Sequence, residues 1–344
     1  REQLVWEVKK EYEFLHPDTY INLTFNKDLP AAGTWYKKKV ANTIARMIRT
    51  GEITWDVVFV DYIVYSYVQE LLNDPLWGRK HLVDFREFPW FRNSQKNSIL
   101  NDPYYREQSG DILTGPFIEG FITCLWYNKI VAEKIGVEVA ERNMSLDAFF
   151  SYAEALDQYN RQHNQHIPLI KLSSFNRLDC LFEFLFKSQF TSSNGANAQI
   201  FTEEKATHFL NTLHIFENLS AYKPAINLQW QSLEYRQWHR DFLDGDGLFI
   251  VSGTYAYSYF KGMDPTRMEN LIPVEFPHVL QVNGLVGGYN PSFAVMKNSP
   301  HKEAAIDLLQ LWSEPRIAEK WVDYTKNPTG LRGHLHQPVS QGMA

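Results

Sequence analysis

The sequence predicts an α/β protein of two domains, and three observations lead to this prediction. The chain has 344 residues, and globular domains average roughly 150 residues. Segments with the spacing of amphipathic helices alternate with short apolar runs rich in β-branched residues, which is the pattern of a parallel sheet with crossover helices. No internal repeat, low-complexity tract or flexible linker separates the domains, so we expect the chain to cross between them more than once.

Helix and strand signals alternate through the first sixty residues. Residues 2–15 have one apolar side and predict a helix, and residues 20–25 alternate as a strand. A second helix is predicted for about residues 34–50, with Gly51 as its stop. Residues 55–60 form an apolar run typical of a buried strand.

The same alternation continues through the middle of the chain. Strands are predicted at 121–127 and 248–251, and residues 177–187 predict a deeply buried helix. Ser145 and Thr202 are typical helix N-caps, and each precedes a helical pattern. The inward stripe expected for the helix after Thr202 consists of Phe209, Leu210, Leu213 and Phe216.

The segment Gly284–Trp312 predicts a glycine-rich loop, a strand and an amphipathic helix. Ser299 is the expected N-cap and Pro300 the expected first helical residue. The apolar face of this helix is formed by Ala305, Leu308, Leu309 and Trp312.

Composition and charge exclude several classes of protein. Hydrophobic residues make up 44% of the chain and charged residues 22%, which is ordinary for a soluble protein. The net charge of −6 disfavours nucleic acid and provides no basic footprint for an anionic membrane. No apolar run reaches the roughly 18 residues of a spanning helix, and no leader peptide opens the chain. Both a cytoplasmic protein and a mature exported protein fit these observations.

Cysteines and aromatic residues add two expectations. Cys124 and Cys180 lie among apolar neighbours and are expected to be buried free thiols, with a disulfide as the alternative in an exported protein. The 10 Trp, 18 Tyr and 23 Phe residues mostly fill cores, but the surplus of Tyr and Trp also suits a pocket that stacks on sugar rings.

Five segments in order resemble one family. The chain is similar to bacterial extracellular solute-binding proteins of family 1, the maltose-binding-protein type, which deliver solutes to ABC importers. The Tyr-Asn-Lys signature at 127–129 resembles that family's entry into its second lobe, and residues 144–149 resemble the helix that follows. The matching segments are His16–Phe25, Thr50–Asp61, Gly115–Lys129, Phe242–Tyr257 and Gly284–Trp312.

Two departures from the family concern the ends of the chain. Family members begin with a strand before the first helix, whereas this sequence starts directly in that helix. They also usually carry more residues beyond the stretch 324–330. The sequence is therefore expected to be trimmed or to lack both pieces, which would leave a sheet edge unpaired and remove one wall of the ligand cleft.

The resemblance implies a two-lobed periplasmic-binding-protein-like fold of type II, with ligand held between lobes that close by a hinge motion. No bond is broken in this mechanism, so no enzymatic activity and no cofactor or metal are expected. Hinges are implied near Gly115–Pro116 and Ser252–Gly253. The implied lobes are residues 1–115 with 255–300 for lobe I and 117–253 with 312–344 for lobe II, and residues 301–311 form a hinge-crossing helix.

The resemblance also implies partners and a location. The ligand would be a carbohydrate, and the protein partner would be the membrane permease of an ABC importer, with no nucleic acid. A monomer is expected, exported to the periplasm or held at the cell surface as a lipoprotein. A ligand-sensing domain of a signalling receptor is the alternative, and a glycosidase with two carboxylates is a third hypothesis.

The candidate ligand-binding residues follow strand ends and crossing segments. Asp61 and Tyr62 come directly after the apolar run 55–60, where open parallel sheets bind ligands, and helix capping is the alternative for Asp61. Glu119 and Phe117 lie in the first crossing segment, with solvent and core as their respective alternatives.

The remaining candidates are mostly aromatic. Tyr255 lies at the return crossing, and Tyr289 and Asn290 lie on the glycine loop. Trp230 and Trp321 are expected to stack on the ligand from the second lobe, and Trp90 is a weaker candidate. Burial in the core is the alternative for these tryptophans.

Some motifs carry no functional prediction. Asp244–Gly247 lacks most ligands of a calcium loop and predicts a turn. His163 and His166 have no third metal ligand nearby in the sequence. No nucleophile elbow, phosphate-binding loop or dinucleotide fingerprint is present in the sequence.

Overall fold

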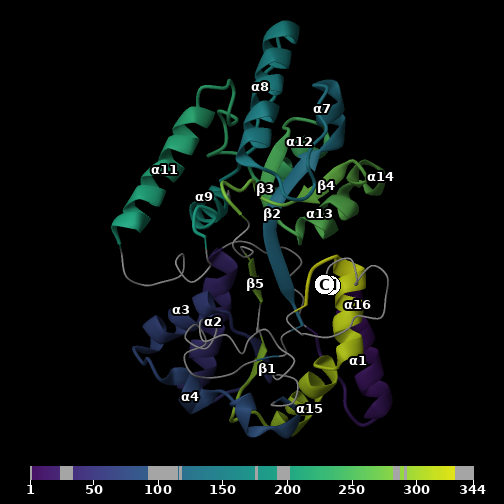
Figure 1. Cartoon of the computed structure of the whole chain (residues 1–344). Helices are drawn as coiled ribbons and strands as arrows, with labels where there is room; N and C mark the ends of the chain where they lie inside the picture. The colour runs from purple at the N-terminus through teal and green to yellow at the C-terminus, as the bar shows by residue number, and fades with distance from the viewer. Residues whose placement is uncertain are drawn as a thin grey trace. The chain divides into compact units, whose positions relative to one another are not determined.

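A computed structural model describes residues 2–23, 34–91, 115, 118–174, 177–191, 202–281, 287–289 and 293–329. The chain forms two compact units (Figure 1). The first comprises Arg1–Phe121 and Gly288–Ala344, and the second comprises Ile122–Gly287. The chain thus passes between the units twice, and each unit combines helices with strands, which confirms the α/β class.

The units differ from the expected lobes in two segments. Residues 255–287 belong to the second unit, because β4 (Leu271–Val274) pairs with β2 (Gly120–Asn128). Residues 312–344 fall in the first unit, where α16 (Pro315–Thr325) packs against α1 (Glu2–Leu15). Ser252–Gly253, an expected hinge, lies inside the second unit.

The first unit is built on a short antiparallel pair of strands, β1 and β6, in which Val58 is opposite Ala294. Alternate residues of each strand point to opposite faces, as strand geometry requires. Val58 and Ala294 face a core shared with α2 and α3, whereas Val295 faces a core shared with α15. The further elements of this unit are α2 (Thr34–Thr50), β1 (Val57–Phe59), α3 (Tyr62–Leu72), α4 (Trp77–His81), η1 (Phe85–Glu87), β6 (Phe293–Val295) and α15 (Lys302–Trp312).

The second unit is a layered structure around the sheet β3-β2-β4, whose pairs are antiparallel. The expected parallel pairing is wrong for these strands, because β3 and β4 both run antiparallel to β2. Isolated bridges such as Ile170 with Phe249 are parallel. The further elements are α7 (Lys129–Lys134), α8 (Leu146–His163), α9 (Leu178–Lys187), α11 (Glu203–Leu219), α12 (Tyr235–Leu243), β3 (Phe249–Gly253), α13 (Ala256–Met263) and α14 (Pro265–Met268). A short strand, β5 (Gly287–Tyr289), follows later in the chain.

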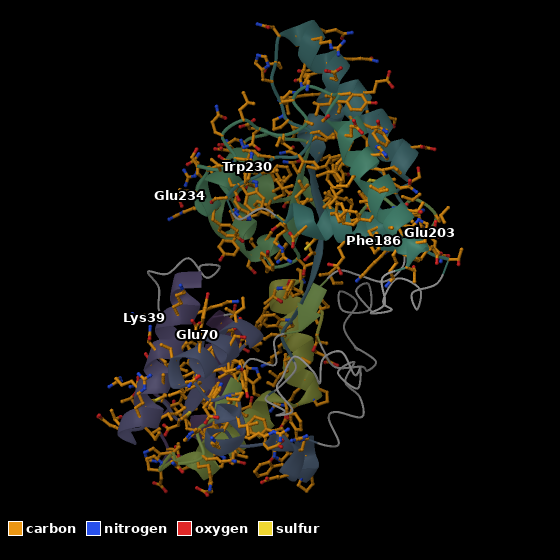
Figure 2. The ribbon with its side chains drawn as sticks, turned by 90° about the vertical axis from the view of Figure 1, so that its left-hand side faces the viewer. Lys39, Glu70, Phe186, Glu203, Trp230 and Glu234 are labelled. Atoms are coloured by element: carbon orange, nitrogen blue, oxygen red, sulfur yellow. The ribbon has the colours of Figure 1, made fainter. Side chains whose placement is uncertain are left out.

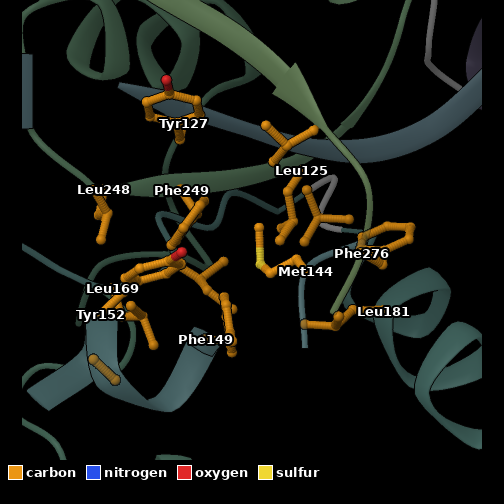
Figure 3. Close-up of a cluster of buried hydrophobic side chains, with 14 of the residues drawn as sticks. Leu125, Tyr127, Met144, Phe149, Tyr152, Leu169, Leu181, Leu248, Phe249 and Phe276 are labelled. Atoms are coloured by element: carbon orange, nitrogen blue, oxygen red, sulfur yellow. The ribbon is translucent and has the colours of Figure 1, made fainter. Parts of the chain in front are cut away.

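Strand β2 is buried on both faces, and its residues alternate between two cores. Leu125 and Tyr127 point into a core with Phe149 of α8 and Phe249 of β3 (Figure 3). Cys124 and Trp126 point into the opposite core, which includes Trp238 of α12 and Phe260 of α13. Helices therefore cover both faces of the sheet, as the nearly continuous apolar sequence of β2 requires.

The inward face of α11 agrees with the expected stripe at Phe216, which packs against the core and stacks on Phe182, and differs at the other three positions. Phe209, Leu210 and Leu213 are exposed by 43%, 55% and 45%. Phe209 still touches the ring of Phe182, with centroids 5.2 Å apart. The buried residues of this helix are Lys205, Thr212, Ile215 and Leu219. The helix instead packs Ile215 and Leu219 into the core, and the side chain of Gln189 donates to the hydroxyl of Thr212, which satisfies this polar residue on the inside.

Two other local expectations are corrected. Helix α15 begins at Lys302 rather than at Pro300, and the Ser299 hydroxyl accepts from the backbone N–H of His301 and donates to Asp56. Residues 20–23 form no strand, and residues 24–25 lie outside the described part of the chain.

The predicted N-cap of α8 is confirmed and gives a testable contribution to stability. Ser145 Oγ accepts a hydrogen bond from the backbone N–H of Ala148 at 3.1 Å. We expect Ser145→Ala to lower the free energy of unfolding by about 1 kcal/mol, because this N–H loses its acceptor. Urea denaturation measures the change.

Two matched variants control this prediction. Ser145→Asp supplies a new acceptor and should retain most of the stability. Ser151→Ala removes an exposed hydroxyl in the same helix and should change the stability by less than about 0.5 kcal/mol. Equal losses for both alanine variants would contradict the capping role.

Candidate functional site

Three chain segments of the second unit meet at one edge of its sheet. Thr123 lies near the start of β2 and is paired in register with Gly253, the last residue of β3. The extended segment 169–172 runs parallel to β3, with a bond of 2.8 Å from Lys171 N–H to the Phe249 carbonyl. The loops that follow residues 172 and 253 therefore leave the sheet at the same edge. Ligands often bind at the carboxyl ends of neighbouring parallel strands, which is where these loops begin. We call this place the Thr123 edge, formed by Thr123, residues 173–174 and 177, and residues 253–255.

Tyr255, a predicted site residue, is held firmly at the Thr123 edge. Its ring lies so close to Gly253 that a Cβ atom there would be 2.2 Å from Tyr255 Cε1. The backbone of the turn is fixed by Thr254, which bonds to both backbone groups of Ile122 at 2.8 and 3.2 Å. Burial raises the pKa of the Tyr255 hydroxyl, and the positive charge of Arg177 opposes this effect. The phenol is therefore neutral at pH 7 and able to donate a hydrogen bond.

Arg177 contributes a cation to the same edge. It directly precedes α9, and its side chain is 40% exposed. The guanidinium Nη2 donates to Cys180 Sγ at 2.9 Å, and Nε lies 3.5 Å from Asp179 Oδ1. Burial raises the pKa of the Cys180 thiol, against the opposing effect of Arg177, so the sulfur is a neutral acceptor. This contact fixes the direction of the guanidinium group.

A second predicted residue, Trp230, belongs to a segment that is tied to the loop at the Thr123 edge. The backbone N–H and the hydroxyl of Ser174 both lie 3.4 Å from the carbonyl oxygen of Leu233, three residues beyond Trp230. The Trp230 ring is half-buried against the core that contains Phe249. Figure 2 shows Trp230 and Glu234 on this segment.

Buried aromatic rings support the edge from within the unit. The Trp238 indole N–H donates to the Lys171 carbonyl at 2.8 Å, which fixes the segment 169–172. His239 is fully buried between aromatic rings and lies 2.8 Å from the Tyr235 carbonyl through Nδ1. Burial lowers the pKa of His239 to about 4, so this ring is neutral at pH 7. The aromatic support is therefore uncharged at pH 7.

Asp61 caps a helix, which was the alternative to ligand binding. Its Oδ1 accepts from the backbone N–H of Val64 at 2.8 Å, and its Oδ2 lies 2.6 Å from Lys37 Nζ. A carboxylate has about four lone-pair directions, so acceptor capacity is left for a hydroxyl group. Ligand binding by Asp61 stays a prediction.

The other predicted residues have different outcomes. Glu119 is buried, with 3% exposure, in the first unit. Trp321 is 5% exposed in the core formed with α1, and its indole N–H donates to the Pro328 carbonyl at 3.0 Å. Core packing, the alternative for Trp321, is what the structure shows. Trp90 packs on Phe85 and Phe91, with centroids 5.8 and 5.6 Å away. The side chains of Tyr62, Phe117, Tyr289 and Asn290 lie outside the described part of the chain.

Arg177 and Ser174 were missed by the sequence analysis. The available signal was the mostly polar stretch 173–177, which separates the segment Leu169–Leu172, apolar except for Lys171, from the mostly apolar helix at 178–187. The same placement, directly after a strand, led to the prediction of Asp61. The extended segment 169–172 is short and was not recognised as strand-like.

A shallow hollow of about 460 Å³ lies on the first unit, and Lys38, Lys39, Asn42, Thr43 and Arg46 line it. All five residues belong to α2, and Figure 2 shows Lys39 among them. The hollow is open and is lined by these residues of one helix, none of them aromatic, so it does not have the concave character of a small-molecule site.

Both cysteines are free and buried, as expected. Burial raises the pKa of Cys124 to about 12, so its thiol is unreactive at neutral pH. In the described ranges, no three or more His, Cys, Asp or Glu residues are grouped in a way that could hold a metal ion.

Comparison with solved structures decides the fold. A raffinose complex of the solute-binding protein RafE matches 98% of this chain and 83% of its own, with 16% identity and a TM-score of 0.65. RafE from Streptococcus pneumoniae matches in its apo form as well, with the same TM-score. Maltose-bound MalE3 of T. maritima matches 99% of this chain and 81% of its own, with 16% identity and a TM-score of 0.68. The chain has the periplasmic-binding-protein fold.

Other comparisons complete this result. The GacH receptor of Streptomyces glaucescens, solved unliganded and with acarbose, matches 99% of this chain and 79% of its own, with 14% identity and a TM-score of 0.67. No family model and no curated protein matches the sequence. No helix in the described ranges has both the length and the apolar character needed to cross a bilayer.

Proposed function

We propose that this protein binds a carbohydrate and delivers it to an ABC importer without changing it chemically. The Thr123 edge carries the proposal, because a fixed aromatic ring, a hydroxyl-bearing loop and a guanidinium group meet at the end of a sheet. Solved structures with the same fold hold raffinose, maltose and stachyose. The likeness supports the ligand class, and the edge supplies the chemistry that such ligands need.

The side chains at the Thr123 edge match the two kinds of surface on a sugar ring. The Tyr255 ring offers a flat face to C–H groups, and such a stack contributes about 0.5–1.5 kcal/mol beyond area burial. The Tyr255 hydroxyl, Ser174 and Arg177 offer hydrogen bonds, each with a net contribution of about 1 kcal/mol or more. One further stack from Trp230 and a few additional hydrogen bonds would bring the total to about 8 kcal/mol, which corresponds to micromolar affinity.

The proposed mechanism is capture by hinge closure. A ligand that binds one arrangement of the two units better than another shifts the population toward that arrangement. The closed form would then be recognised by the membrane permease of the importer. Export to the periplasm or the cell surface is part of this proposal.

Thermal melting with a ligand panel tests the proposed function. We expect raffinose, stachyose, maltose or a related sugar to stabilise the protein, by about 2.7 kcal/mol at 100 times the dissociation constant. Amino acids and a dipeptide serve as controls. Stabilisation by these controls alone would contradict the carbohydrate class, and release of monosaccharides from a bound oligosaccharide would contradict the absence of chemistry.

A further inference from the structure

The charge at the Thr123 edge is weakly balanced. Among the residues that the structure describes, Asp179 supplies the carboxylate within 4 Å of the Arg177 guanidinium. This carboxylate is 72% exposed and lies 3.5 Å from Nε. Pairs of this kind between solvated neighbours contribute little, because water screens them. The other close contact of Arg177 is the thiol of Cys180, which carries no charge at neutral pH.

A second cation of the same unit shows the contrast. Lys171 is 4% exposed and is neutralised by two carboxylates, Asp241 at 3.2 Å and Asp246 still closer. The fold therefore balances the cation in its interior, whereas Arg177 keeps most of its charge available at the edge. The planar guanidinium of Arg177 is also held in one direction by its contact with Cys180 Sγ, so little side-chain entropy is lost when an anion binds.

A guanidinium group with free N–H donors binds a carboxylate through two parallel hydrogen bonds. Cys180, which accepts from Arg177, packs in the same core as Val251 of β3, and β3 ends two residues before Tyr255. A ring stacked on Tyr255 would therefore bring its substituents toward the guanidinium. We infer that the ligand is an anionic carbohydrate with a uronic acid unit, and that Arg177 binds its carboxylate while Tyr255 packs on the sugar ring. This inference rests on the proposed function and specifies its ligand class.

Calorimetric titration of the full chain tests the inference. The acidic probes are di- and trigalacturonate, the neutral probes are galactobiose and galactotriose, and galactose 1-phosphate represents a different anion. We expect the acidic probes to bind at least tenfold more tightly than neutral probes of the same length. Arg177→Gln should lower the affinity for the acidic probes at least tenfold and change that for the neutral probes by less than threefold.

Two matched variants control for charge and for folding. Lys187→Gln removes a cation at the other end of α9, where it pairs with Glu183, and should leave every affinity unchanged. Arg177→Lys keeps the charge but not the fork, and should recover only part of the affinity for the acidic probes. Circular dichroism and melting verify that each variant is folded.

The outcomes separate this inference from the proposed function. The carboxylate assignment would be overturned if the neutral probes or galactose 1-phosphate bound more tightly than the acidic probes. It would also be overturned if Arg177→Gln lowered the affinity for acidic and neutral probes equally. Either result would leave carbohydrate binding intact. If no carbohydrate in the broader melting panel binds, the proposed function fails and the assignment of Arg177 fails with it.

Discussion

Replacing Gly253 by alanine is expected to weaken ligand binding at least tenfold and to destabilise the second unit by about 2 kcal/mol. The new Cβ would lie 2.2, 2.5 and 2.9 Å from three atoms of the Tyr255 ring, distances that no side chain tolerates. The backbone at Gly253 has little freedom to move, because its carbonyl accepts from the Trp126 indole at 3.2 Å and its strand pairs with β2. The ring of Tyr255 must therefore leave its position.

Gly262→Ala is the matched control for this prediction. Gly262 lies in α13, the helix that starts after Tyr255, and a Cβ there meets no atom within 4 Å. Alanine favours the helix over glycine, so this variant should be stabilised by up to about 1 kcal/mol with unchanged affinity. Urea denaturation gives the stabilities and calorimetry gives the affinities. Full affinity in Gly253→Ala would show that the ligand does not need Tyr255 in this position.

Much of the fold could be predicted from the sequence, because local patterns and tertiary packing agree there. Helix α2 spans Thr34–Thr50 as predicted, since its apolar spacing and Gly51 both mark the boundaries. The caps Ser145 and Thr202 each accept from the backbone N–H three residues on. The strand predicted at 121–127 is contained in β2, whose apolar residues serve two cores at once.

Features that depend on distant partners could not be predicted in the same way. In α11, Thr212 is buried because Gln189, twenty-three residues earlier, donates to its hydroxyl, and apolar spacing alone does not reveal such a partner. Strand direction was equally inaccessible, because a buried apolar run reads the same in parallel and antiparallel pairs. Residues 255–287 fall in the second unit rather than in the expected lobe, because β4 pairs with β2, and this pairing could not be predicted from local sequence either.

The candidate site shows a similar division. The position of Tyr255 at a strand end was predicted from its place after Ser252–Gly253, whereas the contact between its ring and Gly253 needs coordinates. The position of Asp61 fits both ligand binding and helix capping, because a carboxylate between a strand and a helix is also a typical N-cap of that helix. Residue type alone does not distinguish a ligand-binding tryptophan from a core tryptophan. Trp321 is a core residue, and its indole N–H donates to a backbone carbonyl.

The largest change in stability is expected when the carboxylates around Lys171 are neutralised together. Lys171 is 4% exposed, and its ammonium group pairs with Asp241 and Asp246. The variant Asp241→Asn/Asp246→Asn leaves a buried cation without counter-charge, and we expect it to lose about 3 kcal/mol of unfolding free energy. Urea denaturation of the full chain, followed by tryptophan fluorescence, measures the loss.

Removing the cation of Lys171 instead should lower the stability only slightly. The carboxylates of Asp241 and Asp246 are 23% and 53% exposed, so water can solvate them when the cation is absent. Lys171→Met keeps the apolar stem of the side chain and is expected to cost less than about 1 kcal/mol. Added to the double variant, the same substitution should restore at least about 2 kcal/mol, because it removes the uncompensated charge. Simple addition of the separate losses would mean that the ion pairs do not act as a unit, and that the turn at 244–247 is held by its backbone bonds instead.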